Sequence, residues 1–173
     1  RTQAILPLRG KILNVTKLDD IYTCMKNEEI KSIVNSIGAG LFDDCDPSIS
    51  RYERIIILTD ADPDGLNISA LVIGLFVNVL PEIVKAGMLY VAEPALYGWK
   101  DKDGYHFTDN IKAIPKGVPF TRYKGLGEMD PEELQYSILD PQYRKLMQVE
   151  YPEDLSAMNS VLTSSKVKFN RLK

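Results

Sequence analysis

The chain has 173 residues, of which 45% are hydrophobic and 26% are charged, a composition typical of a soluble globular protein with a sizeable apolar core. Its only histidine, His106, and its two cysteines, Cys24 and Cys45, which lack CxxC spacing, indicate neither a zinc site nor Ser-His-Asp or Cys-His catalysis. The longest apolar stretch, 68–80, is too short for a bilayer and no signal-peptide pattern is present, so we expect a cytoplasmic protein.

The first half of the chain predicts a strand, helix and strand unit. Helical spacing of isoleucine and valine over 28–37, between Asn27 and Gly38, predicts an amphipathic helix. The apolar run 55–58 predicts a strand buried on both faces of a parallel sheet. A helix is predicted from about 67 to 85 and a second strand at 88–92. The predicted fold class is therefore α/β, with a right-handed crossover.

The second half of the chain shows shorter patterns. Residues 96–108 predict a hairpin, 109–119 a loop, and 120–123 a short strand before the glycine-rich turn KGLG at 124–127. Asp130 predicts a helix N-cap with Pro131 at the first helical position. A helix at 152–162 and a basic end at 166–173 follow. We expect a core at 1–108 and a small, mostly helical tail at 109–173.

An acidic turn follows the strand predicted at 55–58. Residues 60–65 read DADPDG, so three carboxylates leave the carboxyl end of a buried strand, where ligands bind in open α/β sheets. These like charges repel one another, and a bound cation would neutralise them. Because oxygen donors occur without His or Cys, the turn predicts Mg²⁺, Mn²⁺ or Ca²⁺ and not Zn²⁺.

Several alternatives compete for this turn. An ordinary solvated turn is the simplest, since Asp, Pro and Gly are common turn formers. An EF-hand requires a bidentate Glu at its twelfth position, where this chain has Leu71. A haloacid-dehalogenase-like Mg²⁺ phosphatase also places Asp-x-Asp after an apolar strand, but it leaves residues 124–127 unexplained. A non-catalytic, metal-stabilised interaction module is the fourth alternative.

Basic residues gather in three places, although the net charge is −3. These clusters lie at 9–11, 122–124 and 166–173. A local cluster of positive charge bears more directly on nucleic-acid binding than the net charge does. For the last cluster, a solvated surface is the default interpretation.

Three motifs occur in a fixed order along the chain. They are QAILPLRGKILNV at 3–15, DADPDG at 60–65 and RYKGLGEM at 122–129. In this order and rough spacing the chain resembles the B subunits of type IIA DNA topoisomerases, the gyrase and topoisomerase IV family. The resemblance runs through nearly the whole chain, including EPALY at 93–97.

The resemblance implies a Toprim domain, a Rossmann-like parallel sheet flanked by helices that holds one or two Mg²⁺ ions beside double-stranded DNA. Mn²⁺ or Ca²⁺ would substitute for Mg²⁺. The implied metal ligands are Asp60, Asp62 and Asp64. The implied DNA-binding residues are Arg9, Lys11, Asn14, Arg122, Lys124 and Gly125.

The resemblance also implies an assembly. The nucleophilic tyrosine belongs to a partner A-type subunit, so none of the nine tyrosines here is nominated. ATP binds in the N-terminal ATPase part of the B-type subunit. The family's Toprim Glu is expected just before Gln3 and is absent here, so we expect the metal site to be incomplete and the chain inactive alone. The assembled enzyme is expected at the cytoplasmic nucleoid.

Overall fold

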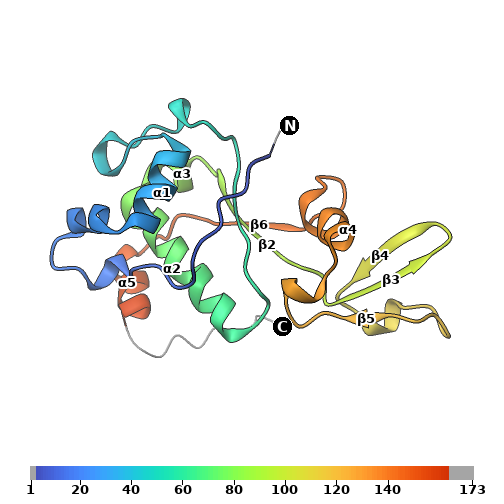
Figure 1. Cartoon of the computed structure of the whole chain (residues 1–173). Coiled ribbons are helices and arrows are strands. Elements are labelled where there is room, and N and C mark those ends of the chain that lie inside the picture. Colours follow the sequence, from blue (N-terminus) through green and yellow to red (C-terminus); the bar gives the residue numbers. More distant parts are fainter. Residues whose placement is uncertain (1–2, 164–173) are drawn as a thin grey trace.

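Two lobes make up residues 3–163, the part of the chain that the computed structural model describes (Figure 1). The helices of the larger lobe are α1 (Glu28–Ile37), α2 (Pro63–Val79), α3 (Pro81–Lys85) and α5 (Leu155–Thr163), and its strands are β1 (Ile55–Ile57), β2 (Leu89–Ala92) and β6 (Leu146–Gln148). The smaller lobe contains β3 (Tyr97–Asp101), β4 (Gly104–Thr108), β5 (Thr121–Arg122) and α4 (Pro131–Leu134), which continues as a π-helical turn (Gln135–Leu139). Short 3₁₀ turns lie at Val15–Lys17, Ile21–Lys26, Phe42–Asp44, Pro47–Ile49, Ile111–Ala113 and Leu126–Glu128.

Helix α1 has the bounds that the sequence predicts. The Asn27 side chain accepts a hydrogen bond from the Ile30 N–H at 3.1 Å, which satisfies one of the free donors at the helix N-terminus. Gly38 ends the helix with φ of 71°, a left-handed conformation that favours glycine. The buried face consists of Ile30, Ile33, Val34 and Ile37.

The predicted β1, helix and β2 unit is confirmed. β1 pairs in parallel with β2, with Ile56 opposite Tyr90, and α2 connects them. The helical segment is longer at its start than predicted, because Asp62 caps it and Pro63 occupies its first turn. It is also broken at Leu80, since Pro81 has no N–H to continue the helical bonding and begins α3 instead.

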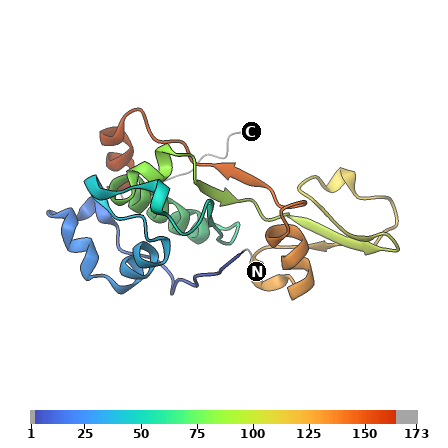
Figure 2. The same ribbon diagram turned by 90° about the horizontal axis from the view of Figure 1, so that it is seen from above.

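The sheet of the larger lobe is only partly parallel. Its strand order is β1-β2-β6, and β6 runs antiparallel to β2, with Val91 opposite Met147. The α/β class is therefore confirmed, while the parallel Rossmann-like character rests on the β1 and β2 pair alone within the described residues. Figure 2, seen from above, shows β2 and β6 side by side between the helices and the smaller lobe, pointing in opposite directions.

A second three-stranded sheet builds the smaller lobe. The predicted hairpin forms β3 and β4, and β5 joins the other edge of β3, which gives the order β4-β3-β5. The Tyr123 ring packs directly against Gly98, where an added Cβ would lie 2.4 Å from the phenol oxygen. A small apolar cluster around Tyr123 contains Ala92, Met129 and Ile138.

The tail after residue 109 contributes strands as well as helices to the two lobes. β5 pairs with β3 and β6 pairs with β2, so each lobe contains segments from both sides of the predicted 108/109 division. This division stays a prediction. The basic end predicted at 166–173 lies outside the described residues.

Helix α5 makes polar contacts with the rest of the larger lobe. The Asn78 and Asn159 side-chain amides exchange two hydrogen bonds, at 3.0 and 2.9 Å, which join α2 to α5. The Asn14 side-chain amide donates to the Leu162 carbonyl at 2.9 Å. Across residues 3–163, no helix combines the length and apolar character needed to cross a bilayer.

The core of the larger lobe yields a first prediction. Phe76 on α2 is 1% exposed, so Phe76→Ala leaves a cavity and should lower the free energy of unfolding by about 3–5 kcal/mol in urea titrations. Ile49, 60% exposed, provides the control, and Ile49→Ala should stay within about 0.5 kcal/mol of the unmodified chain. Equal losses in both variants would contradict this packing.

Candidate metal and nucleic-acid site

The acidic turn is fixed by its own backbone and by the start of α2. The Asp62 carboxylate caps α2 by accepting a hydrogen bond from the Gly65 N–H at 2.7 Å. The positive end of the helix dipole therefore lies beside the carboxylates and offsets part of their repulsion. The Thr59 and Ser69 hydroxyls share a hydrogen bond of 2.8 Å, which ties the entry of the turn to α2.

Gly65 lets the turn fold back tightly on itself. A Cβ added at this position would lie 2.0 Å from the Asp60 carbonyl oxygen, well inside van der Waals contact. The backbone of Asp60 therefore passes directly over the first turn of α2. As a result, the side chains of Asp60, Asp62 and Asp64 project from one short segment whose backbone is closely packed.

The glycine-rich turn at 124–127 lies against this acidic turn. The Leu126 N–H donates to Asp60 Oδ1 at 2.7 Å, across 66 positions of sequence. A Cβ added at Gly125 would lie 3.1 Å from the same carboxylate oxygen, so glycine allows the close approach. Glu128 shapes the turn from the other side, because its carboxylate accepts from the Lys124 N–H at 2.8 Å.

A buried phenol holds this glycine-rich turn in place. The Tyr123 hydroxyl donates to Glu133 at 2.6 Å, and Glu133 forms a reciprocal capping box with Asp130 at the start of α4. Burial and the adjacent Glu133 carboxylate raise the pKa of Tyr123 above its ordinary value. The phenol therefore stays protonated at neutral pH and remains a hydrogen-bond donor.

The N-terminal motif also contacts the acidic turn. Lys11 Nζ lies 2.9 Å from Asp64 Oδ1. Both side chains are exposed, by 57% and 74% respectively, so solvent screening keeps this ion pair weak and exchangeable. The three motifs that are far apart in the sequence thus meet at the acidic turn.

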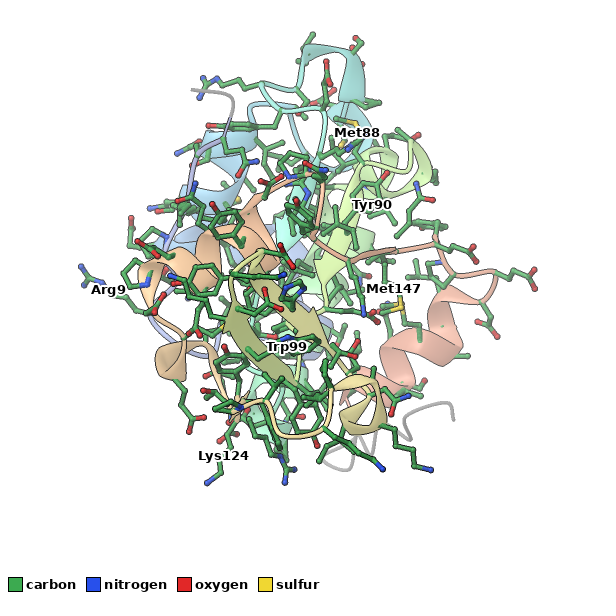
Figure 3. All side chains as sticks on the ribbon, turned by 90° about the vertical axis from the view of Figure 1, so that its right-hand side faces the viewer. Arg9, Met88, Tyr90, Trp99, Lys124 and Met147 are labelled. Carbon is green, nitrogen blue, oxygen red and sulfur yellow. The ribbon has the colours of Figure 1, made fainter. Side chains whose placement is uncertain are left out.

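Within residues 3–163, the predicted DNA-binding residues Arg9, Asn14, Arg122 and Lys124 form no hydrogen bond or ion pair with the three carboxylates. Arg122 is exposed on β5, opposite Tyr97. Figure 3 shows the Arg9 and Lys124 side chains projecting outward at separate places on the surface of the molecule. The Asn14 side chain is partly buried and already hydrogen-bonded within the protein. It caps the turn at Val15–Lys17 and donates a hydrogen bond to the Leu162 carbonyl. The DNA contacts of these residues stay predictions.

The donor chemistry of the acidic turn suits a hard cation. Among residues 3–163, no three carboxylate, imidazole or thiol groups converge closely enough to enclose a metal ion by themselves. Mg²⁺ does not require such a cage, because it retains several waters and binds through one or two carboxylates. Asp60 and Asp62 each use only Oδ1 in the bonds described above, and carboxylate oxygens are the donors that Mg²⁺ prefers.

Sequence reasoning missed several residues that shape the site. The Leu126 N–H is a backbone donor, which no side-chain pattern can predict. Glu128 and the pair Tyr123 and Glu133 act by supporting the turn at 124–127. The one available signal was Asp130 with Glu133 three positions later, a spacing typical of a capping box.

Family matches agree with this arrangement. Residues 1–94 match the Toprim domain, and residues 115–171 match the carboxyl terminus of the DNA gyrase B subunit. Since the first match covers more than half of the chain, the chain belongs to the Toprim domain family.

The similar curated proteins are B subunits of DNA topoisomerase 4. The chain is 42% identical over 174 residues to the one from Staphylococcus epidermidis RP62A, and 40% identical to the one from Staphylococcus aureus MW2. Each alignment covers 93% of this chain and 26% of the relative. The resemblance expected from the three motifs is confirmed, and the chain spans about a quarter of the length of these relatives.

The tight turn yields a second prediction. Gly65→Ala forces its new methyl group against the Asp60 carbonyl and should lower the free energy of unfolding by about 1–3 kcal/mol, measured by urea denaturation. Gly127→Ala is the matched control, because nothing lies within 4 Å of its Cβ position, and should cost less than about 0.5 kcal/mol. A neutral Gly65→Ala would show that the turn is looser than described.

Proposed function

We propose that this chain holds Mg²⁺ and DNA at the cleavage gate of an ATP-dependent type IIA DNA topoisomerase. The observation that supports the proposal most strongly is the Leu126 to Asp60 hydrogen bond, which joins the glycine-rich turn to the acidic turn. Lys11 at Asp64 brings the third motif to the same place. Phosphate recognition and metal binding would therefore share one small surface.

Each residue has a distinct role in this proposal. Asp60 and Asp62 would be the principal ligands of Mg²⁺, and Asp64 would be a further ligand once Lys11 releases it. When bound, Mg²⁺ supplies charge stabilisation to the phosphodiester oxygens during cleavage and religation. The Leu126 N–H would keep Asp60 in one orientation, so that less ordering is needed when substrate binds.

The basic residues would position the DNA backbone. Lys11 is paired with Asp64, Lys124 precedes the glycine that packs on Asp60, and Arg9 and Arg122 would add further positive charge. Gly125 would let phosphate approach the backbone closely. Asn14 would act in DNA binding only indirectly, through the segment that it orders.

The chemistry would be completed by partners. A tyrosine of an A-type subunit would attack the DNA backbone to form a phosphotyrosyl link. The N-terminal ATPase part of the B-type subunit would couple ATP hydrolysis to duplex passage. The chain by itself would not cut DNA, because this nucleophile comes from the partner.

The metal assignment yields a third prediction. Asp62→Asn should lower Mg²⁺-dependent, tyrosine-linked double-strand cleavage by about 100-fold or more when the chain acts within a complete B-type subunit mixed with its A-type partner. Asn is also a good N-cap, so α2 should be retained. Asp46 caps the turn at Pro47–Ile49 in the same way, and Asp46→Asn is the matched control that should cleave normally.

Undiminished cleavage by Asp62→Asn would contradict the metal assignment. If no cleavage occurs with any variant and the unmodified chain instead hydrolyses a phosphate monoester, the haloacid-dehalogenase-like alternative is correct. If neither activity appears, the acidic turn belongs to a metal-stabilised interaction module.

The DNA-binding assignment yields a fourth prediction. Binding of the chain to duplex DNA should weaken as salt rises, and each lost phosphate contact should reduce the slope of log K against log salt by about 0.9. The double variant Lys11→Ala with Lys124→Ala should therefore flatten the slope by about 1.8, measured by fluorescence anisotropy. An unchanged slope would exclude this face as the DNA site.

A further inference from the structure

Tyr123 lies between the sheet of the smaller lobe and the glycine-rich turn at 124–127. All nine tyrosines fall within the described residues 3–163, and Tyr123, at 4% exposed, is the buried one among them. We propose that Tyr123 is a positioning residue of the metal site, which sets the affinity of the acidic turn for a divalent cation by holding the glycine-rich turn against it. This inference rests on the proposed function, because it concerns the same cation.

The phenol of Tyr123 is fixed from two sides. Its ring packs on Gly98 of β3, where an added Cβ would lie 2.4 Å from the phenol oxygen and 2.9 Å from a ring carbon. Its hydroxyl donates to Glu133 Oε1 at 2.6 Å, while Glu133 Oε2 accepts from the Asp130 N–H at 3.0 Å. Because both oxygens of Glu133 are engaged, this carboxylate cannot follow a displaced phenol without losing its part in the capping box of α4.

The backbone connects Tyr123 to Asp60 over three residues. The Tyr123 N–H donates to the Leu96 carbonyl at 2.9 Å, which attaches this end of the glycine-rich turn to the smaller lobe. Further along the turn, the Leu126 N–H donates to Asp60 Oδ1 at 2.7 Å, and Gly125 packs on the same oxygen. A displaced Tyr123 would therefore move the donor that orients Asp60.

Loss of the Tyr123 hydroxyl should weaken cation binding for an identifiable reason. A carboxylate that is already held in one orientation loses less freedom when it binds a metal ion, and removal of groups that orient metal ligands lowers metal affinity by about 10–100-fold. Burial and the adjacent Glu133 carboxylate raise the pKa of Tyr123, so the hydroxyl remains a donor at neutral pH. Tyr123→Phe keeps the ring on Gly98 and removes this hydrogen bond alone.

Tyr105 provides a matched control on the same helix. Its hydroxyl also donates to a glutamate in the first turn of α4, Glu132, at 2.8 Å. Its other described contacts are with Lys100, Phe107 and Tyr136, none of which belongs to the glycine-rich turn. If a bond from tyrosine to glutamate served only to attach α4 to the neighbouring sheet, loss of either hydroxyl would have the same effect.

Titration of the full chain with Mn²⁺ tests the inference, with free Mn²⁺ measured by its electron paramagnetic resonance signal. Tyr123→Phe should raise the Mn²⁺ dissociation constant about tenfold, because Tyr123 acts on the ligand Asp60 through the glycine-rich turn. Tyr105→Phe should leave the dissociation constant unchanged. Without added metal, amide hydrogen exchange at Leu126 should become faster in Tyr123→Phe and stay unchanged in Tyr105→Phe.

Two further variants separate positioning from overall stability. Glu133→Ala removes the acceptor and leaves the phenol in place, so it should weaken Mn²⁺ binding as Tyr123→Phe does, and it replaces that variant if the latter does not fold. Ile30→Val removes one methylene group from the core of the larger lobe. It should lower the thermal midpoint of unfolding without changing the Mn²⁺ dissociation constant.

The outcomes separate this inference from the proposed function. If Tyr123→Phe and Glu133→Ala bind Mn²⁺ as tightly as the unmodified chain, the inference is overturned and the metal assignment stands. If Ile30→Val weakens binding as much as they do, only overall stability matters and the inference is overturned as well. If the unmodified chain binds no Mn²⁺, the inference and the proposed metal site both fail.

Discussion

Three carboxylates within five residues repel one another, and two backbone hydrogen bonds and one exchangeable ion pair offset part of this repulsion. Asp62 takes the first-turn N–H of α2, Asp60 takes the Leu126 N–H, and Asp64 takes the Lys11 ammonium. These partners come from three separate segments. The three motifs that this chain shares with the B subunits of type IIA topoisomerases therefore come together around the carboxylates of the acidic turn.

The rest of the fold supports these contacts. The apolar β1 and the buried face of α2 anchor the acidic turn in the core of the larger lobe. The smaller lobe anchors the glycine-rich turn through Tyr123, which packs on Gly98 and bonds Glu133. Asp60 is one point of contact between the two lobes, so a shift of either lobe would alter the proposed metal ligands and the glycine-rich turn together.

Much of this arrangement was predictable from the sequence, for identifiable reasons. The helix at 28–37 is predicted by side-chain periodicity, β1 by a continuous apolar run, and the acidic turn by its composition. β6 was missed because three residues give no reliable period, and its pairing with β2 spans more than fifty residues of sequence. The hydrogen bond from the Leu126 N–H to Asp60 could not be predicted from the sequence, because tertiary packing places this backbone donor.

A paramagnetic titration tests the central claim, that the acidic and glycine-rich turns form one cation site. Mn²⁺ added to the ¹⁵N-labelled chain should broaden the amide signals of Gly65 and Leu126 first, because both N–H groups donate to the proposed ligands Asp62 and Asp60. Signals around Asn159 should stay sharp. Broadening of the Gly65 signal without that of Leu126, or broadening centred on the other acidic run at 43–46, would contradict the account.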